Sequence, residues 1–95
     1  MAEFTIRAVP CFRRLYLALQ KKHPEFPVLY AKAINVLTAD PYNHTRRHPI
    51  KKLEGVAQGE GQYRIRLQRF RIRYDIYGAE VLLQYCGIRS ECTYR

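Results

Sequence analysis

The segment from Tyr63 to Tyr74 constrains the fold of this chain more than any other, because it reads YRIRLQRFRIRY. Apolar residues alternate with arginines on both sides of Gln68-Arg69. Successive side chains of a β-strand point to opposite faces of a sheet. The segment therefore predicts two adjacent strands joined by a turn at Gln68-Arg69, with one apolar face and one basic face.

The rest of the chain predicts one α+β domain that spans residues 1–95. Alternating residues predict a first strand at 4–9, and helically spaced apolar residues predict two helices, one ending near His23 and one at Asp40-Pro41. A polar loop is followed by a short edge strand at 51–55 and a glycine-rich turn at 55–61. Three strands are expected at 63–67, 70–77 and 81–87, and a polar tail at 88–95. This order, β-α-α-β-β-β(β), predicts a helical hairpin packed on a curved, mainly antiparallel sheet.

The net charge bears on partners. Seventeen Lys and Arg residues oppose eight Asp and Glu residues, which gives a formal charge of +9. Such an imbalance favours nucleic acid as a partner, and the alternatives are an acidic protein or an anionic membrane surface. No apolar run approaches the roughly 18 residues that cross a bilayer. The first residues lack a secretion signal, so we expect a cytoplasmic location.

The basic face of the two central strands is a candidate binding site. It carries Arg64 and Arg66 from one strand and Arg71 and Arg73 from the next, with no acidic residue between positions 61 and 74. Like charges across a sheet are destabilising, and the planar arginine fork suits phosphate. The pattern predicts an anionic ligand. The alternative is a solvated face whose arginines pair with distant carboxylates.

The polar loop contains a second group of candidates, His44 and His48. Basic neighbours lower the pKa of a histidine, so either imidazole could stay neutral and accept a proton. Pro41 and Pro49 argue against a helical metal-binding pair, and no carboxylate joins the two histidines in the sequence. The alternative is that both are solvent-exposed loop residues.

The tail and the cysteines complete the candidates. Tyr94 could stack on a base of single-stranded RNA, and the alternative is a disordered chain end. Cys11, Cys86 and Cys92 are widely spaced, which predicts reduced, partly buried thiols and no metal site.

Taken in order, several short segments resemble the RelE/ParE toxin superfamily, and within it the RelE-like mRNA interferases. The resemblance covers nearly the whole chain. Its segments are LTADP at 37–41, KLEG at 52–55, YRIR at 63–66, FRIRY at 70–74, GIR at 87–89 and YR at 94–95.

The resemblance implies the toxin half of a type II toxin–antitoxin pair, an endoribonuclease that cuts mRNA at the ribosomal A site and arrests translation. Its partners would be mRNA, the ribosome and an acidic antitoxin that is partly disordered when free. The reaction would need no metal or other cofactor. Catalytic roles fall on Arg64, Arg66, Arg71, Arg89 and Tyr94. RNA-binding roles are expected for Lys51, Lys52, Arg69, Arg73, His44 and His48.

One departure from the RelE pattern leaves alternatives open. RelE has lysines where this chain has Arg64 and Arg66, and arginine cannot give up its proton to act as a base. The candidate general bases are therefore His44, His48 and Tyr94. Two other functions remain, a ParE-like inhibitor of DNA gyrase and a non-catalytic RNA- or ribosome-binding module. Arg89 and Tyr94 match the RelE-like pattern and favour the ribonuclease.

Overall fold

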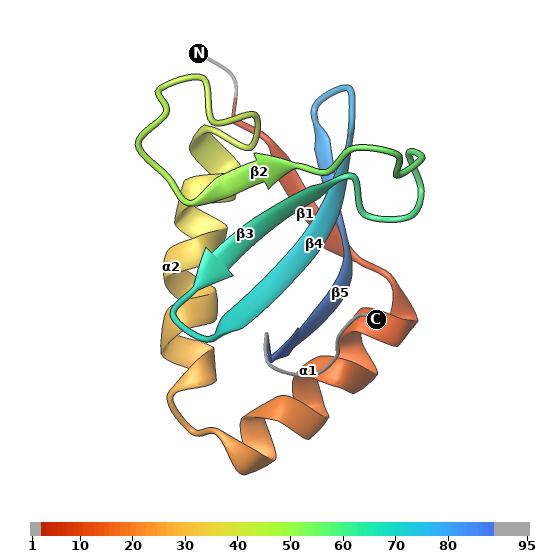
Figure 1. Ribbon diagram of the computed structural model, residues 1–95. Helices are drawn as coiled ribbons and strands as arrows, with labels where there is room; N and C mark the ends of the chain where they lie inside the picture. Colours follow the sequence, from red (N-terminus) through yellow and green to blue (C-terminus); the bar gives the residue numbers. More distant parts are fainter. Residues whose placement is uncertain (1–2, 89–95) are drawn as a thin grey trace.

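The computed structural model describes residues 3–88 of the chain. One sheet has the strand order β1-β5-β4-β3-β2, in which β1 runs parallel to β5 and every other pair is antiparallel (Figure 1). The predicted α+β architecture is confirmed. The elements in chain order are β1 (Thr5–Ala8), α1 (Pro10–Lys22), α2 (Phe26–Ala39), β2 (Ile50–Lys52), β3 (Tyr63–Leu67), β4 (Phe70–Tyr77) and β5 (Glu80–Ile88).

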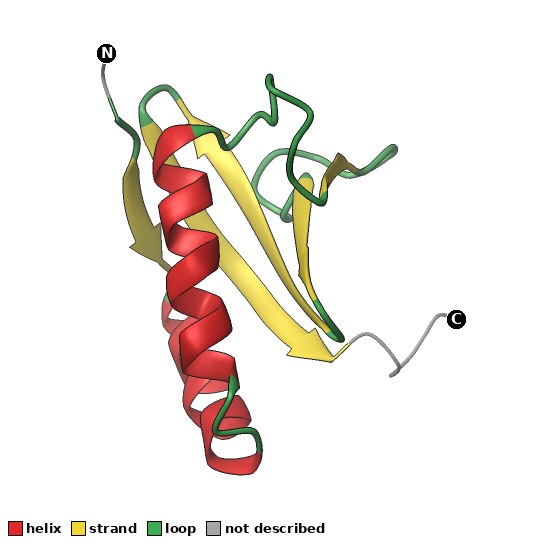
Figure 2. Ribbon diagram, turned by 90° about the vertical axis from the view of Figure 1, so that its left-hand side faces the viewer, coloured by secondary structure: helices red, strands yellow, loops and turns green. Residues whose placement is uncertain are grey.

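Prolines set the bounds of the two helices. Pro10 and Pro27 lie in the first turns of α1 and α2, where a missing backbone N–H costs nothing. Pro24 and Pro41 follow the two helix ends, because the residue before a proline disfavours helical geometry. Both helices pack on one face of the sheet (Figure 2). No helix within residues 3–88 is long and apolar enough to cross a membrane.

The strand register separates apolar from basic side chains. The helix-bearing face carries the buried residues Ile65, Phe70, Ile72 and Tyr74 of β3 and β4. The opposite face, which we call the outer face, carries the alternate residues of the same strands. Arg64 therefore lies opposite Arg73, and Arg66 lies opposite Arg71, as the alternation predicts.

The bounds of three strands differ from the prediction. β1 occupies Thr5–Ala8 instead of 4–9. β2 occupies Ile50–Lys52 instead of 51–55, because the chain turns at Glu54-Gly55, where Gly55 adopts a φ of +76°. β5 occupies Glu80–Ile88 instead of 81–87, and Ile88 is the last residue that the structure describes. A bulge interrupts β5 as well, because Arg73 pairs with Tyr85 whereas Tyr74 pairs with Leu83.

Candidate functional site

The outer face gathers five basic side chains from three strands. One row across the sheet contains Lys51, Arg64 and Arg73, and the next row contains Arg66 and Arg71. Rows on the same face are two residues apart, which is roughly 7 Å along the strands. We call the four arginines, Arg64, Arg66, Arg71 and Arg73, the arginine cluster. Their like charges repel one another across the β3–β4 pair, so bonds to other groups must offset this repulsion.

Near the β4–β5 hairpin, such bonds come from the glycine-rich segment before β3. Arg73 donates from Nε to Gly61 O at 3.1 Å and from Nη2 to Glu60 O at 3.0 Å. Gly61 has a φ of +82°, and a methyl group added there would lie 2.9 Å from the Arg73 Cβ. The guanidinium of Arg73 is therefore engaged in fixing this segment.

Asp75 binds the same glycine-rich segment through its side chain. Its structural role was not predicted from the sequence. Its carboxylate is fully buried and accepts the backbone N–H groups of Gly61 and Gln62, each at 2.9 Å. The side-chain amide of Gln84 donates a third bond at 2.9 Å. A lone acidic residue inside a run of strand-forming residues was the available signal, since a buried carboxylate requires several donors.

Near the β3–β4 turn, the arginine cluster is less fully bonded. The Nε atom of Arg71 is buried and has no hydrogen-bond partner among residues 3–88. Its cross-strand neighbour on β5 is Gly87, which contributes no side chain, and its neighbour on β3 is the exposed Arg66. A buried polar atom without a partner costs about 1–3 kcal/mol. Arg71 as a whole is only partly buried, so a turn of its side chain would bring this nitrogen to a ligand whose anionic oxygens supply the missing acceptor.

The structure does not bring Lys52 or Arg69 to this site. Lys52 pairs with Tyr63 in the register, and its ammonium lies 5.8 Å from the centre of that ring, on the side of the sheet opposite Lys51. Arg69 lies in the β3–β4 turn and donates from Nη2 to Glu25 Oε2 at 3.1 Å, at the connection between the helices. The RNA-binding roles expected for both residues stay predictions.

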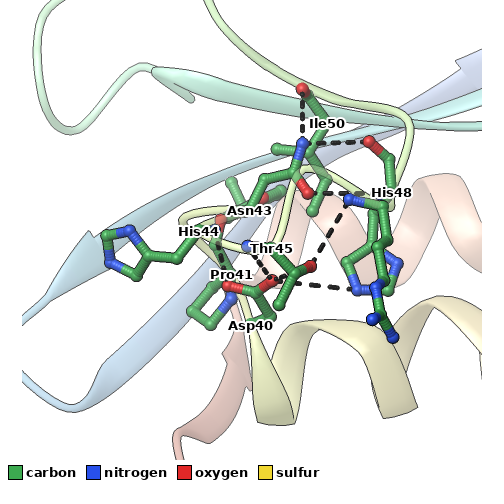
Figure 3. A network of polar contacts seen from close by, with 9 residues as sticks. Asp40, Pro41, Asn43, His44, Thr45, His48 and Ile50 are labelled. Atoms are coloured by element: carbon green, nitrogen blue, oxygen red, sulfur yellow. Dashed lines mark hydrogen bonds and ion pairs between the residues drawn. The ribbon is translucent and has the colours of Figure 1, made fainter.

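His44 and His48 lie in a loop that Asp40 organises at the end of α2 (Figure 3). Asp40 accepts the His44 N–H at 2.8 Å and the Thr45 N–H at 3.1 Å, and the Thr45 hydroxyl donates to it at 2.8 Å. The His48 imidazole is 3.8 Å from the same carboxylate, a neighbour that the sequence did not reveal. The His44 ring points away from this network and contacts Tyr42 instead.

The bonds to Asp40 also change its titration. Burial alone would raise the pKa of this carboxyl, but the hydrogen bonds from Thr45 and His44 outweigh burial and hold its pKa below the usual value. Asp40 therefore remains ionised at neutral pH and keeps the loop attached to α2. The loop leads directly into β2, which contributes Lys51 to the outer face.

Two cysteines lie within the described residues. Cys86 is buried, and burial raises its thiol pKa to about 12, so it is a protonated, apolar core residue at neutral pH. Cys11 is exposed, contrary to the expectation of partial burial. Cys92 lies outside the described residues, as do the predicted site residues Arg89 and Tyr94.

Comparison with known proteins supports the fold independently of these contacts. The chain matches no protein-family model and no curated protein. Among solved structures it is similar to a chain of the archaeal RelE–RelB complex from Pyrococcus horikoshii OT3, with a TM-score of 0.68. The chain has a RelE-like fold. The superposition covers 94% of this chain and 98% of the other at 17% identity, so the likeness concerns the arrangement of helices and strands.

Proposed function

We propose that this protein is the toxin of a type II toxin–antitoxin pair and cleaves mRNA at the ribosomal A site. The observation that carries the proposal is the arginine cluster on the outer face of a RelE-like fold, with the Nε of Arg71 buried and lacking an acceptor within residues 3–88. A phosphate is the ligand that several convergent guanidinium groups suit best.

The proposed reaction is an attack by the ribose 2′-OH on the neighbouring phosphate. A base takes the 2′ proton, and the 2′ oxygen bonds to phosphorus. The bond from phosphorus to the 5′ oxygen breaks, and that oxygen takes a proton from water or from the protonated base. The products carry a 2′,3′-cyclic phosphate and a 5′-hydroxyl. Arg71 and Arg89 stabilise the negative charge of the transition state, Arg64 and Arg66 hold the phosphate, and Tyr94 stacks on the base.

The base in this scheme must come from another residue type, because arginine stays protonated. His44, His48 and Tyr94 remain the candidates. His48 is engaged near Asp40 at the end of α2, and His44 lies against Tyr42. Tyr94 lies six residues after Ile88 in the sequence. Ile88 is on β5 and pairs with Phe70, the residue next to Arg71 on β4.

An antitoxin is the second proposed partner. The similar structure is a RelE–RelB complex, and the present chain carries a charge of +9, which complements an acidic protein. A pocket of about 440 Å³ between α1, α2, β1 and β5 offers an apolar contact, and Arg7 and Arg13 are among the residues that line it. Its apolar lining includes Phe12, Tyr16, Leu17 and Tyr30.

Induced expression in bacteria tests the proposal. Translation should stop within minutes, and new 5′ ends should appear inside translated mRNA. Arg71→Ala should abolish both effects while the protein stays folded. Arg7→Ala is the matched control, because Arg7 is an exposed arginine of the same sheet that already pairs with Glu80 at 3.3 Å.

The outcome separates the proposal from its alternatives. Double-strand DNA breaks with intact mRNA would indicate a gyrase inhibitor. Translation arrest without mRNA cuts would indicate a binding module without catalysis. Normal growth and translation in cells that contain the folded protein would overturn both toxin functions, the ribonuclease and the gyrase inhibitor.

A further inference from the structure

Tyr85 is an exposed aromatic residue at the centre of the outer face that the proposed reaction does not use. It lies on β5 opposite Arg73, and 43% of its surface is accessible. Single exposed rings are common on protein surfaces, so the exposure of Tyr85 alone indicates no function; what distinguishes this ring is its place beside the arginine cluster.

Gly87 determines where the ring lies. A methyl group built at Gly87 would collide with the Tyr85 hydroxyl and lie 2.9 Å from Cζ. The outer part of the ring therefore extends along β5 from its own position over Gly87. Gly87 is the cross-strand partner of Arg71, so the phenol end of Tyr85 lies in the row that contains Arg71 and Arg66.

The position of the Tyr85 ring places an aromatic surface next to the guanidinium of Arg71. Arg71 offers a buried guanidinium nitrogen that has no partner among residues 3–88, and Tyr85 offers an exposed aromatic surface next to it. Single-stranded nucleic acids present the matching pair, a phosphate and a base attached to the same backbone. Stacking of a base on an aromatic side chain is a common way in which proteins hold single strands.

We propose that Tyr85 is a base-stacking residue that positions a nucleotide of single-stranded RNA whose phosphate is bound by Arg71. The inference rests on the proposed function in so far as the ligand is RNA. The stacking surface is the ring, so its hydroxyl is dispensable. Gly87 serves the same site by leaving room for the ring.

The test uses RNA that carries 2-aminopurine, a base whose fluorescence falls when it stacks on an aromatic ring. A 2′-O-methyl group at each nucleotide prevents cleavage, and the RNA is offered both free and in the A site of programmed ribosomes. Bound wild-type protein should quench one labelled position. Tyr85→Phe should keep the quenching, whereas Tyr85→Ala should lose it and bind roughly 5- to 150-fold more weakly.

Two further variants sharpen the result. Tyr77→Ala is the matched control, because Tyr77 is 40% exposed on the same face but six residues from Arg71 along β4, roughly 20 Å away. It should bind and quench like the wild type. Gly87→Ala keeps the tyrosine but displaces its ring, so it should also reduce quenching.

Equal quenching by wild-type protein and Tyr85→Ala would overturn the inference, as would equal losses in Tyr77→Ala and Tyr85→Ala. Absence of binding to RNA in both settings would overturn it as well. If the wild type quenches the label through Tyr85 but never cuts unmodified mRNA, the stacking position stands and the proposed cleavage fails. If it cuts mRNA and Tyr85→Ala cuts equally well with unchanged quenching, cleavage stands and the stacking position fails.

Discussion

The two ends of the arginine cluster contain the same residue type in different surroundings. Near the β4–β5 hairpin, Arg73 donates to two backbone carbonyls, and the adjacent Asp75 carboxylate accepts three hydrogen bonds. Near the β3–β4 turn, the Nε of Arg71 is buried without a partner among residues 3–88, beside a glycine and an exposed tyrosine. Charge alone does not distinguish these two ends, whereas the available hydrogen-bond acceptors do.

We infer that the two ends have different roles: Arg73 stabilises the fold, and Arg71 binds the ligand. An arginine whose donors are satisfied by the backbone stabilises the fold, and its bonds would have to break before it could hold a ligand. An arginine with a buried donor and no acceptor gains the most from a bound anion. We therefore expect substitutions at the two ends to affect different properties, stability at Asp75 and catalysis at Arg71.

The largest expected effect is on the rate of RNA cleavage by Arg71→Ala. Loss of one preorganised donor to a developing negative charge typically lowers a rate about 100- to 1000-fold. The unfolding midpoint should change little, because the variant also removes a buried unpaired nitrogen and one like-charge contact with Arg66. Single-turnover cleavage and thermal unfolding of the same preparations measure both properties. A large loss of stability would contradict the assignment of Arg71 to the binding end.

A smaller effect, on stability, is expected for Asp75→Asn. The substitution places an amide donor against the N–H groups of Gly61 or Gln62, so at least one buried donor loses its acceptor. The free energy of unfolding should fall by about 2–3 kcal/mol, as measured with urea. The rate per folded molecule should fall much less than in Arg71→Ala. If both variants lost activity equally while folded, the two ends would not have separate tasks.

Asp40→Asn should cost less, about 1–2 kcal/mol of unfolding free energy at pH 7, because the bonds that it weakens hold a partly exposed loop. The loss should depend on pH. The pKa of Asp40 is lowered in the folded state, so its stabilising contribution is complete above the usual value of 3.8 and is lost as the pH falls through the folded value. Urea unfolding at several pH values should show the wild type and the variant converging below about pH 4. A difference that stays constant down to pH 2 would show that the carboxylate charge has no part in it.

The smallest effect is expected for Arg69→Ala. Its guanidinium contacts Glu25 and His23 at the exposed surface, where ion pairs contribute little and are screened by salt. Cleavage rate and unfolding midpoint should both remain near the wild-type values. A loss of activity comparable with that of Arg71→Ala would extend the site around the β3–β4 turn and restore the RNA-binding role expected for Arg69 from the sequence.

The sequence predicted those parts of the structure that depend on local periodicity. The bounds of β3 and β4 agree with the prediction, because the alternation on both sides of Gln68-Arg69 allows only one register, and Gln68 adopts the positive φ of a tight turn. The helix ends follow from Pro24 and Pro41. The three-residue β2 was placed less well, since so short an edge strand has no periodicity of its own.

The division within the arginine cluster could not be predicted in this way. Arg71 and Arg73 are equivalent in the alternation. They differ because a segment more than ten residues earlier folds onto Arg73, and because Arg71 lies opposite Gly87 on β5. Likewise, Lys51 and Lys52 are neighbours in sequence but lie on opposite faces of β2. Tyr85 was absent from the candidates, because only the cross-strand pairing places it over Gly87 beside Arg71.

The role of Arg71 in RNA cleavage is tested most directly with the purified protein on mRNA in programmed ribosomes, with wild type, Arg71→Ala and Arg7→Ala compared. We expect cuts that leave a 2′,3′-cyclic phosphate and a 5′-hydroxyl and that a 2′-deoxy nucleotide at the cut blocks. Arg71→Ala alone should slow them at least about 100-fold. Equal cleavage by wild type and a folded Arg71→Ala, or cleavage that persists at the 2′-deoxy position, would contradict these expectations.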